Sequence, residues 1–176
     1  QLHLQAPLHL TVTGGPWGLA CNAVHLLDLM AWWSGESLVA LCTDQLDDSW
    51  FAAKRAGMWE IYGTLTATFS GGTTAKLTSS SSEVPTHFFE LTDGKGTWRV
   101  DEANGTAVHT DGTEIPGCIP YQSELTATLV DEILDTGDCQ LPTLYESVAI
   151  HRLFIDAMLG HWQNHSDPAA TFVPIT

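Results

Sequence analysis

The chain has 176 residues, of which 44% are hydrophobic and only 15% are charged, a composition typical of a globular protein and not of a disordered one. Its formal net charge is −15, because 21 acidic side chains face only six basic ones. Nucleic acids and anionic membrane surfaces are bound through clusters of lysine and arginine, so we expect neither as a partner. No apolar run in the sequence approaches the ~18–20 residues of a membrane span.

The start of the chain and its cysteines bear on its compartment. Residues 1–13 lack the basic region of a secretory signal. The four cysteines are widely spaced and form no CxxC pair, which argues against a zinc knuckle. We therefore expect reduced thiols and a cytoplasmic protein. The chain begins without an initiator methionine, which fits either a processed protein or an excised fragment.

The first third of the chain predicts a strand, a helix and a second strand. Residues 8–13 alternate in polarity, which predicts a strand, and the turn of residues 14–16 ends it. The stretch from Gly18 to Gly35 predicts a helix that buries aliphatic and indole side chains and stops at a glycine. Residues 37–46 predict the second strand, whereas residues 47–57 are polar and ambiguous.

The rest of the chain predicts strands followed by two helices. Further strands, separated by glycine-containing turns, are predicted at residues 60–69, 74–82, 86–91, 96–100 and 107–110. Together with the strand of residues 37–46 they predict an antiparallel meander of about six strands. Helices are expected at residues 121–136 and from a capping box of Thr143 and Glu146 to about residue 162. This order predicts an α+β fold, an open and mainly antiparallel sheet with helices packed on one face, in a single domain over residues 1–176.

Polar residues in the predicted helix of residues 18–35 are the first candidates for chemistry. Cys21, His25 and Asp28 lie at i, i+4 and i+7 and share one face. His25 is the best acid–base candidate, because imidazole transfers protons near neutral pH. Asp28 could orient it, and Asn22 could donate a hydrogen bond to a substrate oxygen. The alternative is that His25 is a structural histidine satisfied within the core.

Two further groups of residues invite a functional interpretation. Lys54 and Arg55, the only adjacent basic pair, could hold an anionic group of substrate or cofactor, or could be plain surface charges. His161 and His165 have the i, i+4 spacing of metal ligands, with Asp167 nearby, but the sequence places no third ligand. A small metal-dependent hydrolase therefore stays a third hypothesis. The sequence contains no dinucleotide fingerprint, phosphate loop or nucleophile elbow.

Four stretches, in this order, resemble the dihydrodipicolinate reductase-like carboxy-terminal domain of the Gfo/Idh/MocA oxidoreductase family. The first, residues 17–36, is similar to the family's D-x-G-x-H-x-x-D helix and places His25 and Asp28 in register. Cys21 and Ala23 stand where the family has its Asp and Gly. The other stretches are residues 54–69, 69–77 and 132–150, so the likeness spans nearly all of residues 8–176.

The resemblance implies the substrate-binding and oligomerisation domain of an NAD(P)-dependent oxidoreductase that acts on a sugar-like or polyol substrate. His25 would transfer the proton, and Asn22, Asp28, Lys54 and Arg55 would contact the substrate. NAD or NADP and a catalytic lysine would come from an amino-terminal Rossmann domain absent from this chain, so we expect the isolated chain to be inactive and to bind no cofactor. The family also implies a homodimer or homotetramer through the open sheet face. The alternative is a non-catalytic dimerisation or scaffold module of the same fold.

Overall fold

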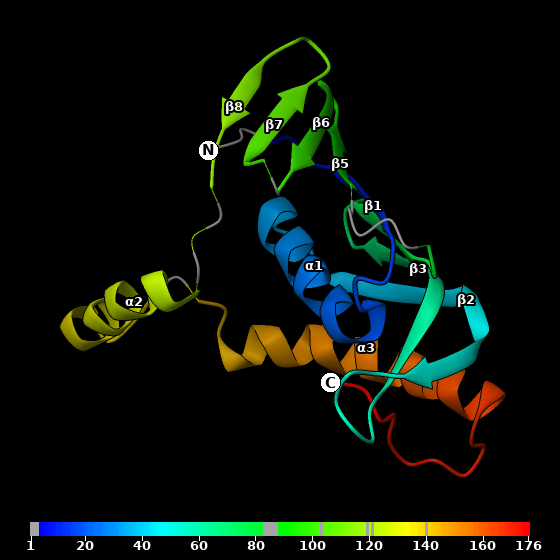
Figure 1. The fold of residues 1–176 in the computed structure, drawn as a ribbon. Coiled ribbons are helices and arrows are strands. Elements are labelled where there is room, and N and C mark those ends of the chain that lie inside the picture. Colours follow the sequence, from blue (N-terminus) through cyan, green and yellow to red (C-terminus); the bar gives the residue numbers. More distant parts are fainter. Residues whose placement is uncertain (1–3, 83–87, 103, 119, 121, 140) are drawn as a thin grey trace.

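The computed structural model describes residues 4–82, 88–102, 104–118, 120, 122–139 and 141–176. Its strands form one eight-stranded sheet in the order β2-β3-β4-β1-β5-β6-β7-β8 (Figure 1). In chain order the elements are β1 (His9–Gly14), α1 (Leu19–Ser34), β2 (Leu38–Ala52), β3 (Trp59–Phe69), β4 (Thr74–Ser79), β5 (Phe88–Asp93), β6 (Gly96–Asp101), β7 (Thr106–His109), β8 (Glu114–Pro116), α2 (Gln122–Thr136) and α3 (Leu144–His165). The predicted α+β class with an open, mainly antiparallel sheet is confirmed.

The first strand lies in the middle of the sheet, and here the expected simple meander is wrong. β1 pairs in parallel with β4 on one side and antiparallel with β5 on the other. Its inward side chains Leu10 and Val12 are buried and face Ala75 and Leu77 of β4 in register. A strand with fully buried inward side chains favours a central place in the sheet, with a paired strand on each side. Turn signals between consecutive strands do not reveal such a place.

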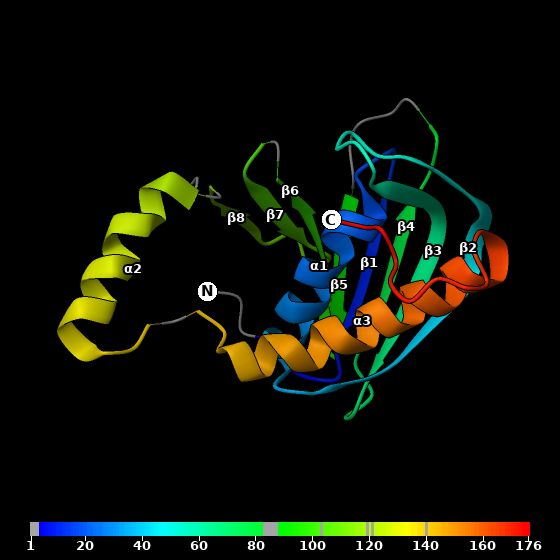
Figure 2. The same ribbon diagram turned by 90° about the horizontal axis from the view of Figure 1, so that it is seen from below.

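The core lies between the sheet and two of the three helices. α1 buries Leu19, Ala23, Leu27 and Met30, and α3 buries Ile150, Phe154 and Met158, each at helical spacing. Both helices cover the same face of the sheet (Figure 2). Each fully buried aliphatic or aromatic side chain of this size contributes about 1.5–3 kcal/mol. The prediction of helices on one face is therefore confirmed for α1 and α3.

The second helix does not follow that prediction. α2 stands apart from the body formed by the sheet, α1 and α3 (Figures 1 and 2). Its apolar side chains Leu125, Val130, Ile133 and Leu134 are 44–77% exposed. The helical spacing of these residues correctly predicted a helix, but within this chain its apolar stripe meets no core.

The opposite face of the sheet is polar and rich in threonine. The outward positions of β1, β3, β4, β5, β6 and β7 carry one threonine after another, which we call the threonine face; it comprises Thr11, Thr13, Thr64, Thr66, Thr68, Thr74, Thr78, Thr92, Thr97 and Thr106. Hydroxyls of Thr64 and Thr78 lie 2.8 Å apart across β3 and β4, as do those of Thr92 and Thr97 across β5 and β6. Threonine suits such positions because its branched side chain packs on a pleated surface while its hydroxyl pairs across strands.

Smaller differences concern boundaries. The ambiguous residues 47–52 continue β2, and the short β8 was not expected. The capping box is confirmed, since the Thr143 hydroxyl accepts from the Glu146 amide at 3.3 Å and the Glu146 carboxylate accepts from the Thr143 amide at 2.8 Å.

Tyr121 and residues 86–87 of the predicted elements lie outside the described residues. Across the described ranges, none of the helices has the length and apolarity required to cross a membrane.

Candidate functional site

The polar residues of α1 lie on the side of the helix that points away from the core. Asn22 and His25 are exposed, and Cys21 and Asp28 are half-buried. Trp32, seven residues after His25 on the same face, is 69% exposed, so the expected burial of the indole side chains is wrong at this position. Because these polar groups are not buried, they need no partner within the core, and the face is open to a ligand or another domain.

Asn22 is partly committed to local structure. Its side-chain Nδ2 donates to the carbonyl of Trp17 at 2.7 Å, which closes the turn before α1. The Trp17 indole in turn donates to the carbonyl of Thr78 at 2.8 Å and ties this turn to β4. The expected role of Asn22 as a donor to substrate therefore competes with a hydrogen bond already made, and its side-chain oxygen is the better group for a ligand.

His25 and Asp28 share a face, but the structure does not bring them into contact. Within the described residues no hydrogen bond or ion pair joins the two side chains. The idea that Asp28 orients His25 therefore stays a prediction.

Lys54 and Arg55 lie in the loop between β2 and β3, and both side chains are exposed. The loop is closed by backbone hydrogen bonds from Met58 to Arg55 at 3.1 Å and from Ala53 to Met58 at 2.9 Å. Neither cation forms a salt bridge with any residue that the structure describes. The loop leads directly into the start of β3, which contacts the first turn of α1.

Glu60, the second residue of β3, makes that contact and was missed from the sequence. Its side chain is 7% exposed and accepts hydrogen bonds from the backbone amides of Ala20 at 2.9 Å and Cys21 at 3.0 Å. Burial raises the pKa of the Glu60 carboxyl, and the hydrogen bonds from Ala20, Cys21 and Ile61 offset part of the rise. An acidic residue at the start of an otherwise uncharged strand is the one signal that could have indicated it.

The residues predicted from the sequence thus fall on two segments that Glu60 links. We use the name α1 site for Asn22, His25 and Asp28 on the helix together with Lys54 and Arg55 in the loop before β3. Glu60 joins the two segments, because it sits at the start of β3 and contacts the first turn of α1.

His161 and His165 form a packing cluster. The His161 ring stacks on His165 with centroids 4.4 Å apart and lies 5.7 Å from the Trp50 ring. His165 Nδ1 is 3.3 Å from the Asp48 carboxylate, whereas Asp167 accepts from the Ala169 amide. No group of three His, Cys, Asp or Glu side chains in the described part of the chain could hold a metal ion.

Comparison with known proteins gives matches in structure alone. No family model matches the sequence, and neither does any curated protein. UDP-N-acetylglucosamine 3-dehydrogenase from Acidithiobacillus ferrooxidans matches 90% of this chain and 52% of its own, with 17% identity and a TM-score of 0.56. Aldose-aldose oxidoreductase from Caulobacter crescentus, complexed with glycerol, matches 88% and 55%, with 18% identity and a TM-score of 0.56.

A third solved structure is myo-inositol dehydrogenase from Lactobacillus casei in complex with NAD(H) and myo-inositol. It matches 93% of this chain and 54% of its own, with 12% identity and a TM-score of 0.57. The chain has the fold of Gfo/Idh/MocA-type oxidoreductases. The resemblance inferred from the sequence is thus confirmed for the fold. The chain spans about half the length of the solved structures it matches.

Within this Gfo/Idh/MocA-type fold, the described residues do not offer a dinucleotide cradle. The only glycine-rich turn that leads from a described strand into a described helix joins β1 to α1. There the amides of Ala20 and Cys21 are already taken by the Glu60 carboxylate. A phosphate would compete with that carboxylate for the same amides and would be repelled by its charge. The residues present therefore do not fit the pyrophosphate of NAD(P).

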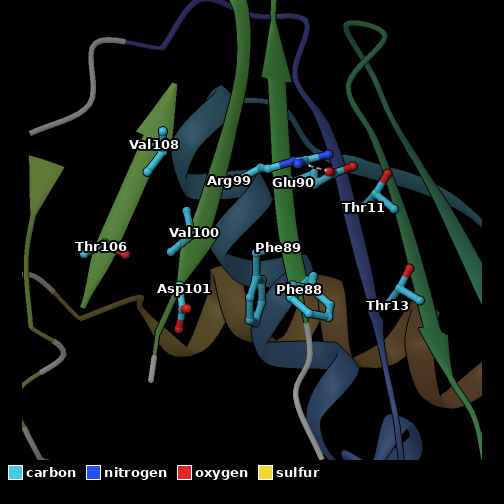
Figure 3. A pocket seen from close by; sticks show the side chains of 10 residues that line it. All are labelled: Thr11, Thr13, Phe88, Phe89, Glu90, Arg99, Val100, Asp101, Thr106 and Val108. Atoms are coloured by element: carbon cyan, nitrogen blue, oxygen red, sulfur yellow. Dashed lines mark hydrogen bonds and ion pairs between the residues drawn. The ribbon is translucent and has the colours of Figure 1, made fainter. Parts of the chain in front are cut away.

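A hollow of about 580 Å³ opens on the threonine face, away from the α1 site (Figure 3). Thr11, Thr13, Glu90 and Arg99 point into it, with α1 and α3 behind the sheet. Two of its charged groups bind each other, since Arg99 Nε donates to Glu90 at 2.8 Å, and the Asp101 carboxylate accepts from the backbone amide of Asn104. Because none of the predicted site residues lines this hollow, we place the candidate site at α1.

Proposed function

We propose that this chain is the carboxy-terminal substrate-binding and oligomerisation domain of an NAD(P)-dependent oxidoreductase that acts on a sugar-like or polyol substrate. The observation that carries the proposal is a likeness in structure to three enzymes named for sugars or polyols. It covers 88–93% of this chain and about half the length of each enzyme. Membership of the Gfo/Idh/MocA family and the arrangement of residues 1–176 as one domain are part of this proposal.

Exposed apolar side chains on the helix-covered side support a second domain as partner. Trp32 of α1 is 69% exposed, and Leu144 and Tyr145 of α3 are 81% and 87% exposed. Large apolar side chains that stay exposed on a folded protein are typical of interaction surfaces. A Rossmann domain would cover them and would hold the NAD(P), which supplies the hydride acceptor or donor when bound.

The residues of the α1 site have the chemistry that the proposal needs. Oxidation of a carbon that bears a hydroxyl removes the hydroxyl proton, and the exposed His25 imidazole would accept it. The side-chain oxygen of Asn22 would accept a hydrogen bond from a neighbouring hydroxyl, and Asp28 would orient the substrate or the imidazole. Lys54 and Arg55, which have no salt-bridge partner within the described residues, would hold an anionic group of the substrate.

The test compares this chain with the full-length gene product that contains it. We expect the gene product to bind NAD(P) and to reduce it in the presence of a polyol or sugar from a panel that includes myo-inositol. We expect no NAD(P) binding by the 176-residue chain in a calorimetric titration. Tight binding of NAD(P) by the isolated chain would contradict the proposal.

The non-catalytic alternative makes a different forecast for the same experiment. A scaffold or dimerisation module would give a gene product that neither binds NAD(P) nor oxidises any member of the panel. The presence of Cys21 where the family has an acid is the feature of this sequence that favours the alternative.

A further inference from the structure

The first turn of α1 depends on a carboxylate from another element. Gly18 precedes the helix with φ +76° and no side chain to cap it, and the first turn contains no acidic residue. The first amides of a helix need acceptors, and the negative charge of a carboxylate is favoured at this end. Glu60 supplies both, with one carboxylate oxygen on the Ala20 amide and the other on the Cys21 amide.

The contact between Glu60 and this turn is closely packed. A Cβ placed on Gly18 would lie 3.3 Å from Glu60 Oε1 and 3.0 Å from Asn22 Nδ2. A movement of the Glu60 carboxylate would therefore displace the turn before α1. That turn includes Asn22, whose side chain donates to the Trp17 carbonyl.

The strand start that carries this glutamate is also anchored next to the loop of the candidate site. Trp59, just before it, donates its amide to the carbonyl of Pro174 at 2.8 Å, which anchors the start of β3 to the end of the chain. Lys54 and Arg55 precede this anchored strand by only a few residues. One buried carboxylate thus connects both segments that carry the α1 site.

The charges around Glu60 leave the helix terminus as its main partner. The titratable or charged groups on the packed elements are carried by α1, the loop, β2 and β4: Cys21, His25, Asp28, Lys54, Arg55, Cys42, Asp44, Asp47, Asp48 and Lys76. In the described structure none of them forms a hydrogen bond through its side chain or a salt bridge with Glu60. The carboxylate is therefore held by backbone amides. Its protonation would remove its charge and weaken both hydrogen bonds at once.

We propose that Glu60 is the positioning residue of the α1 site: its ionised carboxylate holds the first turn of α1, and through it Asn22 and His25, against the start of β3, which follows the loop of Lys54 and Arg55. This inference rests on the proposed function only for the role of the α1 site in substrate binding. The positioning itself can be measured on this chain without an activity assay.

The experiment is an NMR pH titration of the isolated chain. We expect the amides of Ala20 and Cys21 to shift with one midpoint that lies above the ordinary range of glutamate. The side-chain amide of Asn22 and the backbone amide of Ala23 should follow the same midpoint. In Glu60→Gln this common transition should be absent, because the side chain no longer titrates and keeps only one acceptor oxygen.

Glu36→Gln is the matched control. Glu36 accepts from the amides of Gly71 and Thr73 at 2.7 Å and 3.1 Å, so it holds a turn through the same chemistry at the other end of α1. The control should alter the titration of Gly71 and Thr73 and leave that of Ala20 and Cys21 unchanged.

Two results would overturn the inference, and the first is measured on the unaltered chain, so it does not depend on a variant that folds. If Ala20 and Cys21 titrate in the unaltered chain while Asn22 and Ala23 do not follow, Glu60 is a helix cap without influence on the site. If the transition persists in Glu60→Gln, or in Glu60→Asp with its midpoint unmoved, another group is its source. A failed enzyme assay with an intact titration would instead count against the proposed function alone.

Discussion

At the scale of single residues, burial decides what the histidines of α3 can do. His161 is 5% exposed, and its Nδ1 has no hydrogen-bond partner within the described residues. Burial lowers the pKa of His161, the nearby His165 lowers it further, and Asp48 counteracts part of the effect. The i, i+4 spacing seen in the sequence therefore reflects two stacked rings against Trp50, and the spacing alone carried no information on burial.

The lowered pKa of His161 predicts a loss of stability in acid. The unfolded chain binds this proton at the ordinary histidine pKa of ~6.5, whereas the folded chain binds it only at lower pH. Stability is thus fully present above that value and falls as the pH decreases through it, by about 1.4 kcal/mol per pH unit at most for one group. Urea unfolding at about pH 7.5 and pH 5.5 should show a larger loss for the unaltered chain than for His161→Phe.

His151→Asn is the control for this measurement, because His151 is exposed on the same helix. It should lose as much stability in acid as the unaltered chain does. Equal losses in His161→Phe and the unaltered chain would show that His161 does not set the acid sensitivity.

Residues of the candidate site illustrate what a sequence leaves open. His25 and Asp28 could be placed on one helical face from spacing alone, because helix geometry is local. The capping role of Glu60 could not be predicted from spacing, because the contact joins residues about forty positions apart and depends on how β3 packs against α1. Likewise, nothing local shows that the Nδ2 of Asn22 is engaged by the Trp17 carbonyl.

At the scale of elements, α1 is held at both ends by glutamates from outside the helix. Glu60 caps its beginning, and Glu36, just after its end, binds the amides and hydroxyl of the β3–β4 turn. The glycines at both ends were readable from the sequence, which is why the bounds of α1 were predicted closely. The central place of β1 in the sheet could not be predicted, because the paired residues of β1 and β4 lie some sixty positions apart in the sequence.

α2 provides the prediction at this scale. A helix of 15 residues without tertiary packing is marginal in water, because helix nucleation is costly. We expect the amides of α2 to exchange with solvent far faster than those of α1 in the isolated chain, and to become protected in the full-length gene product. Hydrogen exchange followed by mass spectrometry on both proteins makes the comparison.

The amides of α1 are the internal reference, since they should be protected in both proteins. Protection of α2 in the isolated chain equal to that of α1 would show that its apolar stripe needs no further domain.

At the scale of the whole molecule, the fold class followed from the order of elements, whereas the nature of the open face did not. The sequence predicted an oligomer through the open sheet face, whose outward positions carry threonines with a few charged side chains such as Lys76 and Arg99. We propose that this face still joins two or more copies, because rows of threonines on adjacent strands offer a surface that another sheet can cover.

Light scattering at micromolar concentration tests this assembly. We expect a homodimer or larger oligomer for the unaltered chain, and a monomer for Thr66→Glu, which places like charges opposite each other across a symmetric interface. Asn164→Glu adds the same charge on the exposed surface of α3 and should leave the assembly intact. A monomer for the unaltered chain would contradict the proposal.

The central claim is that His25 transfers the substrate proton in an active site of which this chain supplies one half. The most direct measurement is the turnover of the full-length gene product with His25→Asn, beside His151→Asn as a surface control. We predict a fall in kcat of about 10²–10⁴ for His25→Asn with NAD(P) binding unchanged, and no fall for the control. A His25→Asn enzyme that keeps its turnover within about twofold, well short of the effect of general acid–base catalysis, would contradict the account.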